Sequence, residues 1–349
     1  MKKTVLIVAL LVVLAFSGVV ASAATRIGVA MPTQSLQRWN QDGGNMKAQL
    51  EAAGYVVDLQ YANNDVALQI SQLENMILNG AEILVIASID GSALGTVLEI
   101  AKDEGIPVIA YDRLIMETDA VSYYATFDNY MVGTIQGEYL VEALNLKNRT
   151  DSVNIEIVGG SADDNNARYF YQGAYDALEP YIKSGKVVIP SGQVAFEAIA
   201  TMAWSSERAQ SRMDNLIAAH YSDGRKLDAV LCSNDSTALG VTNSLAGAGF
   251  EEFPAITGQD CDVANMKNIL AGRQSMSIFK DTRTLAEKVV GMIQAMAEGS
   301  EPEINDTETY DNGVKVVPTY LCAPVFADAD NYYELLVESG YYTEDQLGI

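Results

Sequence analysis

The stretch Ile106-Pro-Val-Ile-Ala-Tyr-Asp-Arg-Leu-Ile115 decides the fold, because it joins a buried strand directly to a pair of charges. Its portion Val108–Tyr111 is apolar and is typical of a strand that is covered on both faces. Asp112 and Arg113 follow at once, and apolar residues then resume. An exposed turn would explain the two charges but not the apolar residues on both sides of them. We therefore expect a polar ligand at the end of this strand.

Similar apolar strands alternate with amphipathic helical patterns along the chain. Strands are expected at Arg26–Met31, Val56–Tyr61, Ile83–Ala87, Val108–Tyr111, Ser122–Thr126, Val153–Val158, Lys186–Ile189, Ala229–Cys232, Ala255–Thr257 and Ser275–Phe279. Helices are expected at Arg38–Ala53, Asp65–Leu78, Asn166–Tyr181, Ser205–His220 and Thr282–Ala297. This alternation predicts an α/β protein with doubly wound parallel sheets that carry helices on both faces.

The length of the chain predicts two domains. A sequence of 349 residues exceeds what one hydrophobic core usually serves. The alternation of strands and helices is interrupted near Thr126-Phe-Asp-Asn129, but no Pro/Gly-rich linker separates the two halves of the chain there. We therefore expect two sheet lobes that face one another across a cleft and close around a ligand by a hinge motion.

The first 23 residues have the pattern of a cleaved signal peptide. Met1-Lys-Lys3 is a positive start, Thr4–Val20 is apolar, and Ala21-Ser-Ala23 is a small-residue cleavage site. No cysteine follows that site, so a lipid anchor is not expected. The sequence predicts an exported, periplasmic protein.

Composition excludes several classes of function. The net charge of −24 comes from scattered acidic residues, and such a surface repels nucleic acid and anionic lipid. Three cysteines and one histidine form no metal-binding cluster and leave no Ser-His-Asp triad unless His220 serves it. Gly247-Ala-Gly249 lacks the third glycine of a dinucleotide motif. We expect neither a metal nor a cofactor.

Six of the expected strands finish in polar or charged residues. Those segments contain Arg38 with Trp39, Asp112 with Arg113, Asp164 with Asn166, Asn234 with Asp235, Asp260, and Lys280. Ligands of open parallel sheets bind at the carboxyl ends of the strands. Carboxylates, amides and guanidinium groups complement vicinal hydroxyls, and the rings of Trp39 and Trp204 can pack against the apolar face of a pyranose. The pattern predicts a sugar site.

Structural roles could explain some of these residues. Asp164 and Asn166 lie where a helix must be capped, and Asp235 is the expected cap of the helix that follows Asn234. Asp112, Asp164 and Asp260 could also provide the carboxylate pair of a glycosidase. Their Arg, Lys or Asn neighbours would hold them ionised, which does not suit acid catalysis and favours binding.

Several motifs together resemble those of the periplasmic sugar-binding proteins of ABC transporters, of the type I fold. They are Ile27-Gly-Val-Ala-Met-Pro-Thr33, Arg38-Trp39, Gln72-Leu-Glu-Asn-Met76, Leu84-Val-Ile-Ala-Ser-Ile-Asp-Gly91, Val108-Ile-Ala-Tyr-Asp-Arg-Leu-Ile115, Ser122-Tyr-Tyr-Ala-Thr-Phe-Asp-Asn129, Asp164-Asn-Asn-Ala167, Gly258-Gln-Asp260, Ile278-Phe-Lys-Asp-Thr282 and Asn312-Gly-Val-Lys-Val-Val-Pro318. The likeness is greatest to multiple-sugar-binding receptors and more distant to xylose-binding proteins.

The resemblance implies a set of ligand-binding residues and a lobe organisation. The implied ligands are Arg38, Asp112, Arg113, Asp164, Asn166, Trp204, Asn234, Asp260 and Lys280, to which the strand-end pattern adds Trp39. The implied N-terminal lobe is 25–130 plus 282–311, and the C-terminal lobe is 131–281 plus 312–349. Three crossings, near Phe127-Asp128, Asp281 and Gly313, would form the hinge. Gln34 and Ser233-Asn-Asp235 depart from the multiple-sugar pattern and leave the choice of sugar open.

The expected function is that of a monomeric receptor, not an enzyme, that delivers a neutral aldopyranose such as galactose, glucose, arabinose or xylose to an ABC permease. Three site carboxylates face three site cations, so a uronic acid would add an uncompensated charge. The family resemblance points the other way, toward acceptance of sugar acids. Two alternatives stay open: a sugar-processing hydrolase that uses cleft aspartates, and a sugar receptor for chemotaxis or a membrane sensor kinase. A repressor's sensing half is disfavoured by the signal peptide.

Overall fold

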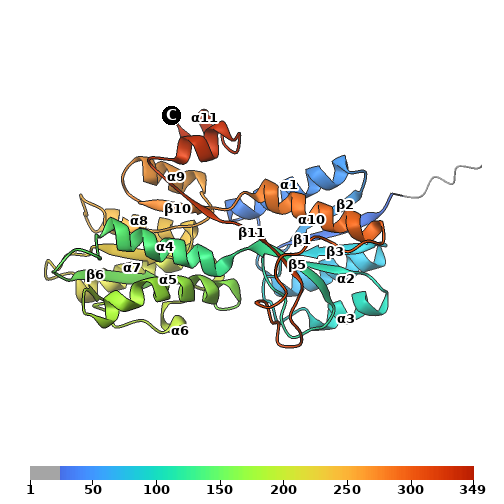
Figure 1. Ribbon diagram of the computed structural model, residues 1–349, viewed down its shortest axis with the longest axis horizontal. Coiled ribbons are helices and arrows are strands. Elements are labelled where there is room, and N and C mark those ends of the chain that lie inside the picture. The colour runs from blue at the N-terminus through green and yellow to red at the C-terminus, as the bar shows by residue number, and fades with distance from the viewer. Residues whose placement is uncertain (1–23) are drawn as a thin grey trace, which may run out of the picture.

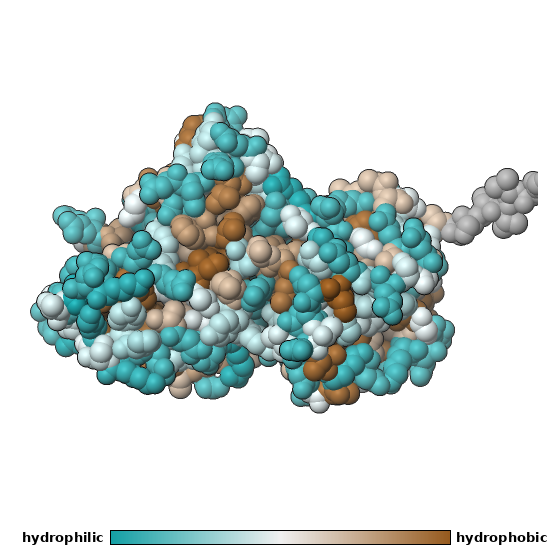
Figure 2. Space-filling view, in the orientation of Figure 1, coloured by the Kyte–Doolittle hydropathy of each residue, from teal (hydrophilic) through white to brown (hydrophobic). Residues whose placement is uncertain are grey.

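The computed structural model describes residues 24–349, so the predicted signal peptide lies outside the described residues. Two lobes lie side by side along the long axis, each built on its own sheet (Figure 1). Most of the face in view is hydrophilic, and the lobes are in contact across it (Figure 2). No helix in the described part of the chain is both long enough and apolar enough to cross a membrane.

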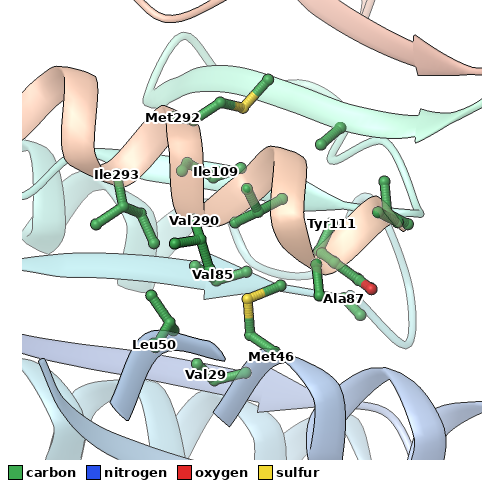
Figure 3. Close-up of a cluster of buried hydrophobic side chains, with 14 of the residues drawn as sticks. Val29, Met46, Leu50, Val85, Ala87, Ile109, Tyr111, Val290, Met292 and Ile293 are labelled. Atoms are coloured by element: carbon green, nitrogen blue, oxygen red, sulfur yellow. The ribbon is translucent and has the colours of Figure 1, made fainter. Parts of the chain in front are cut away.

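The first lobe contains a six-stranded parallel sheet. Its strand order is β11 (Thr319–Cys322), β5 (Val121–Phe127), β4 (Val108–Tyr111), β3 (Ile83–Ile86), β1 (Arg26–Met31) and β2 (Val56–Tyr61). Helices α1 (Gln37–Ala52) and α10 (Thr282–Ala297) cover one face, and α2 (Val66–Leu78) and α3 (Gly95–Asp103) cover the other. Figure 3 shows Met46 of α1 and Val290 of α10 packed against Val85 of the sheet.

The second lobe contains a four-stranded parallel sheet. Its strand order is β7 (Val187–Val188), β6 (Val153–Val158), β8 (Ala229–Cys232) and β9 (Ala255–Ile256). Helices α4 (Asn129–Ala143) and α5 (Asn166–Lys183) cover one face, and α7 (Ser206–His220) and α8 (Asp235–Gly247) cover the other. The remaining helical segments of this lobe are α6 (Phe196–Ile199), η1 (Met202–Trp204), α9 (Val263–Leu270), η2 (Tyr333–Glu338) and α11 (Glu344–Leu347).

The predicted class is confirmed, and two strands are new. All ten predicted strands form, with ends that differ by one or two residues at most. β10 (Met276–Phe279) joins the second sheet through one bridge between Gln259 and Ile278. Its other edge pairs with β12 (Val325–Asp328) in the antiparallel direction, although only parallel pairing was predicted. β11 and β12 were not predicted, because each is four residues long and follows a proline (Pro318 and Pro324) in a segment of weak periodicity.

The last crossing between the lobes differs from the predicted one. Residues 312–349 were all placed in the second lobe, with a crossing near Gly313. Instead, β11 pairs with β5 of the first sheet, and the side chain of Asn312 donates hydrogen bonds to Ile115 and Thr118 carbonyls of the first lobe. The chain therefore leaves the first lobe between Cys322 and Val325. Its other passages between the sheets lie at Asp128 and Asp281, which are the N-caps of α4 and α10.

Candidate functional site

A cavity lies between the lobes at the carboxyl ends of their strands. Its empty volume, including space that is open to solvent, is about 430 Å³. All ten residues predicted from the sequence line it: Arg38, Trp39, Asp112, Arg113, Asp164, Asn166, Trp204, Asn234, Asp260 and Lys280. The structure thus brings together residues that are more than 200 positions apart in the chain. Their contact with a ligand stays a prediction.

Arg38, in the first turn of α1, connects three carboxylates. Its Nε donates to Asp42 Oδ2 at 2.9 Å, its Nη1 donates to Asp260 Oδ1 of the second lobe at 3.1 Å, and its Nη2 contacts Asp112. Behind this group, the hydroxyl of Tyr111 donates to Asp42 Oδ1 at 2.5 Å. Each guanidinium nitrogen therefore has its own acceptor, two on the first lobe and one on the second, and together they orient Arg38.

Charge and burial act against each other on these carboxyl groups. Burial alone would raise the pKa of Asp112, but Arg38, Lys280 and Arg113 together lower it. Burial raises the pKa of Asp42 in spite of its pairing with Arg38. Burial also raises the pKa of Asp164, whose cationic neighbour is Arg113.

The backbone of Asp112 is held in a left-handed conformation, with φ of 60°. Such a conformation is costly for a residue other than glycine, and it needs support from the surroundings. Three side chains donate hydrogen bonds to the Asp112 carbonyl: Tyr124 at 2.5 Å, Thr126 at 2.9 Å and Asn166 at 2.6 Å. Asn166 comes from the second lobe, so this bond also joins the lobes.

Arg113 and Trp39 complete the wall that the first lobe provides. Arg113 Nη1 donates to the carbonyls of Ser88 at 3.1 Å and Ile89 at 3.3 Å. Its Nε lies 3.0 Å from Asp164 Oδ2 across the cleft, but its N–H does not point at that oxygen. The Trp39 ring lies within reach of both guanidinium groups, 5.3 Å from Arg38 Cζ and 5.1 Å from Arg113 Cζ. Trp39 therefore orients the two arginines as well as lining the cavity.

Aromatic rings form the opposite wall. Trp204 ends η1, where Ala203 and Trp204 both have positive φ, and its ring lies 6.2 Å from that of Phe170 of α5. A side chain at Gly160 would collide with the Trp204 ring, which is why a glycine is needed there. Lys280 Nζ lies 3.1 Å from Asp260 Oδ1 and 5.7 Å from the centre of the Phe170 ring.

The second lobe places three carboxylates close together: Asp235, Asp260 and Asp262. The carboxylate of Asp235 accepts hydrogen bonds from Gln274, Ser277 and the backbone N–H of Asp262. Burial and the charges of Asp262 and Asp260 raise the pKa of Asp235 well above its ordinary value. Burial and the charge of Asp260 raise the pKa of Asp262 to about 7.

The capping roles differ from those predicted. Asn234, not Asp235, caps α8 by accepting from the backbone N–H of Thr237 at 3.0 Å. The side chain of Asp164 accepts from the backbone N–H of Asn166 at 3.0 Å, so Asp164 serves the start of α5 as well as lining the cavity. Asp235 lies too deep to cap, because its carboxylate is enclosed by polar groups of the second lobe.

Sequence reasoning missed five residues that line the cavity: Leu36, Phe170, Ser236, Gln259 and Asp262. Phe170 belongs to the amphipathic face of α5, where an aromatic residue is indistinguishable from core by pattern. Ser236 donates to the Trp204 carbonyl at 2.7 Å and fixes the loop that carries that ring. Gln259 and Asp262 flank the predicted Asp260, and that position was the available signal for them.

Unsatisfied polar atoms are concentrated at this cavity. In residues 24–349, nine buried side-chain nitrogen or oxygen atoms have no hydrogen-bond partner. Four of them belong to residues that line the cavity: Arg113 Nε, Trp204 Nε1, Gln259 Oε1 and Asp262 Oδ1. Buried polar groups are normally paired, so their grouping indicates that a polar ligand belongs there. No group of three His, Cys, Asp or Glu in the described chain is arranged to hold a metal ion.

A contact between α1 and the C-terminal segment joins the lobes beside the cavity. The Tyr342 hydroxyl accepts from Gln37 Nε2 at 2.7 Å and from Gln41 Nε2 at 3.0 Å, and donates to the Cys261 carbonyl at 2.9 Å. Gln37 Oε1 in turn accepts from the backbone N–H of Val263 at 3.2 Å. Gln37, Gln41 and Tyr342 do not line the cavity, and their network bonds the two lobes to each other.

Comparison with known proteins identifies the family. Residues 27–301 match the periplasmic binding protein domain. The chain is 51% identical to the multiple sugar-binding periplasmic receptor ChvE of Rhizobium radiobacter, over 92% of each chain. It is 35% identical to the D-xylose-binding periplasmic protein of Escherichia coli, again over 92% of each.

A solved structure agrees with these relatives. It is an ABC transporter solute binding protein from Clostridium phytofermentans with bound β-D-glucose, which is 66% identical and superimposes with a TM-score of 0.91. The match covers 93% of this chain and 100% of that one. These relatives are binding proteins and not enzymes. The chain therefore belongs to the periplasmic sugar-binding proteins of ABC transporters, the family that its motifs resemble.

Proposed function

We propose that the protein is an exported receptor that binds a neutral aldopyranose in the interlobe cavity and delivers it to an ABC permease. The observation that carries this proposal is the composition of the cavity. Arginine, lysine, carboxylate and amide groups line it together with the rings of Trp39, Trp204 and Phe170, and four of its polar atoms lack a partner. A pyranose offers both a rim of hydroxyls and apolar C–H faces, so it matches this arrangement.

Charge favours a neutral sugar over a sugar acid. The site contains the three predicted carboxylates and three cations. Two further carboxyl groups add to this count: Asp262, which lines the cavity, and Asp42, which pairs with Arg38. The carboxyl groups therefore outnumber the cations, and a uronate would add a further negative charge to a dry site. Glucose is the first candidate, because the related solute binding protein holds β-D-glucose.

The proposed partners follow from the family and from the charge of the surface. The sugar would be handed to a membrane permease by a receptor that acts as a monomer outside the cytoplasm. The predicted signal peptide supports export, and the periplasmic relatives support the compartment. A net charge of −24 keeps such a receptor soluble.

Calorimetry tests the choice of ligand. Glucose, galactose, xylose and arabinose are titrated into the protein beside glucuronate and galacturonate at pH 7.5. We expect at least one neutral sugar to bind, and its matching acid to bind at least tenfold more weakly. Equal or tighter binding of the acid would refute the charge argument, and a lack of binding by every sugar would refute the proposed function.

Small-angle scattering tests the closure of the lobes. The structure has direct bonds between the lobes, such as Arg38 to Asp260 and Asn166 to Asp112, which an opening motion would break. We expect saturating sugar to reduce the radius of gyration, because it adds ligand contacts to these bonds. An identical radius of gyration with and without sugar would contradict hinge closure.

A further inference from the structure

Asp262 stands at the N-cap position of α9 but does not cap that helix. An aspartate at this position normally accepts a hydrogen bond from a backbone N–H of the first turn. The Asp262 side chain makes no such bond. The N–H of Val263, the first residue of that helix, donates to Gln37 Oε1, which reaches across from the first lobe at 3.2 Å. The carboxylate of Asp262 is therefore turned away from the role that its position suggests.

The same carboxylate lines the cavity and is not satisfied there. Its Oδ1 atom is buried and has no hydrogen-bond partner. Its backbone is fixed, because its own N–H donates to Asp235 Oδ2 at 2.8 Å. A buried carboxylate oxygen without a donor is destabilising, so this position is complete only when another group supplies the hydrogen bond.

The neighbouring carboxylates do not share this condition. Asp260 Oδ1 lies 3.1 Å from both Arg38 Nη1 and Lys280 Nζ. Asp235 accepts hydrogen bonds from Gln274 and Ser277. Asp260 is thus paired with two cations, and Asp235 with two polar side chains. Burial, and then repulsion from Asp260, makes the charged form of Asp262 unfavourable, which its raised pKa of about 7 reflects. The missing partner is then a hydroxyl donor, not a further anion.

We propose that Asp262 contacts the ligand directly and accepts a hydrogen bond from one hydroxyl of the bound sugar, and so helps to determine which sugars bind. This inference rests on the proposed function, because it needs a sugar in the cavity. It adds the N-cap residue of α9 to a site whose other lining residues come from strand ends, from α1, α5 and α8, and from η1.

Monodeoxy sugars test this contact. Glucose and its 2-, 3-, 4- and 6-deoxy forms are titrated by calorimetry into the wild type, Asp262→Ala and Asp262→Asn. We expect the alanine variant to bind glucose about 10- to 100-fold more weakly, as for loss of a hydrogen bond to a charged group. One deoxyglucose should bind the wild type and the alanine variant equally, because it lacks the hydroxyl concerned. The others should lose affinity as glucose does.

A matched variant separates contact from stability. Asp65 caps α2 by accepting from the backbone N–H of Leu68 at 3.0 Å, and it does not line the cavity. We expect Asp65→Ala to lower the midpoint of thermal unfolding and leave glucose affinity unchanged. Asp262→Ala and Asp262→Asn should leave the sugar-free midpoint unchanged or raise it, because they remove a buried, repelled carboxylate.

The outcomes distinguish this inference from the proposed function. Unchanged glucose affinity in both Asp262 variants, or the same fold-loss for every sugar of the panel, overturns the contact. If the wild type binds neither these sugars nor any other monosaccharide, the proposed function is wrong, and this inference is then wrong as well. Binding by the wild type with loss of the selective pattern overturns only the inference.

Discussion

The two walls of the cavity differ in how far their polar groups are already satisfied. On the first lobe, the three guanidinium nitrogens of Arg38 each have a carboxylate partner, and the Asp112 carbonyl has three donors. On the second lobe, Trp204, Gln259 and Asp262 each keep a buried atom without a partner. The polar groups of the first wall are therefore mostly satisfied by protein partners, whereas the second wall contains most of the groups that a ligand would complete. Affinity should depend on the first wall and discrimination between sugars on the second.

Removal of Arg38 should have the largest effect, because it dismantles the first wall. Arg38→Ala leaves Asp42 and Asp112 buried without their main cation and breaks the link to Asp260. We expect the loss of sugar-binding free energy to be on the order of 2–5 kcal/mol, measured by calorimetry with glucose. Lys47→Ala is the control, since it removes an exposed cation of the same helix that pairs only with Glu51. A loss of less than threefold in Arg38→Ala would show that the first wall is not the source of affinity.

The next largest effect is expected on the free energy of unfolding, which should depend on pH in opposite directions for carboxyl groups of the two walls. The pKa of Asp262 is about 7 in the folded state and lies near 3.8 when unperturbed. Between these values the folded protein keeps a proton that the unfolded chain has lost, so this group makes stability fall as pH rises, by up to about 1.4 kcal/mol per pH unit. On the first wall, the pKa of Asp112 is lowered, so its contribution is present at neutral pH and is lost as pH falls.

Urea unfolding of the wild type and Asp262→Asn from pH 5 to pH 8 measures this contribution. The asparagine variant should become progressively more stable than the wild type up to about pH 7, and the difference should then level off. Asp260, Asp235, Arg38 and Lys280 surround the group and are unchanged in the variant. A difference that does not vary with pH would mean that Asp262 titrates normally.

Replacement of Trp204 should produce a smaller change in affinity and a clear optical one. Trp39 and Trp204 both line the cavity, one on each wall, and they are the only tryptophans of the chain. Trp204→Phe should remove the second wall's part of the fluorescence change on sugar binding and weaken affinity by about 1 kcal/mol. Trp39→Phe is the companion variant, in which the Trp204 signal should remain. If sugar leaves the emission of Trp39→Phe unchanged, Trp204 does not face the ligand.

The smallest effect is expected from the contact that joins the lobes outside the cavity. Gln37→Ala removes the bonds to Tyr342 and Val263 and should weaken the binding of all sugars equally, by about 0.5 kcal/mol, because it acts on closure and not on the ligand. Gln49→Ala is the control, since Gln49 bonds to Arg283 within the first lobe. Calorimetry with two different sugars decides the point, and a sugar-selective loss would contradict a pure closure role.

The sequence was sufficient to predict residues at strand ends, because the geometry of parallel sheets brings those ends together. Trp204 was the predicted residue least supported by this pattern, because it follows no strand and ends a kinked turn with two consecutive positive φ angles. Phe170 was hidden in the apolar face of a helix. Asp262 has the sequence position of a helix cap, and only the structure shows that its side chain makes no capping bond. The residues missed are therefore those whose role depends on side-chain conformation and packing, which a pattern of residue types does not record.

The late position of β11 in the chain has a consequence for the order in which the molecule can assemble. Thr319 pairs with Tyr124 at the edge of the first sheet, and the whole second sheet lies between them in the sequence. A ribosome completes the first lobe's edge strand only after it has made the second lobe's sheet. Contacts between distant segments also form slowly, because they must overcome a large loop-closure entropy. The nascent chain should therefore remain unable to finish its first lobe for most of its synthesis, a delay that would suit the export proposed from its predicted signal peptide.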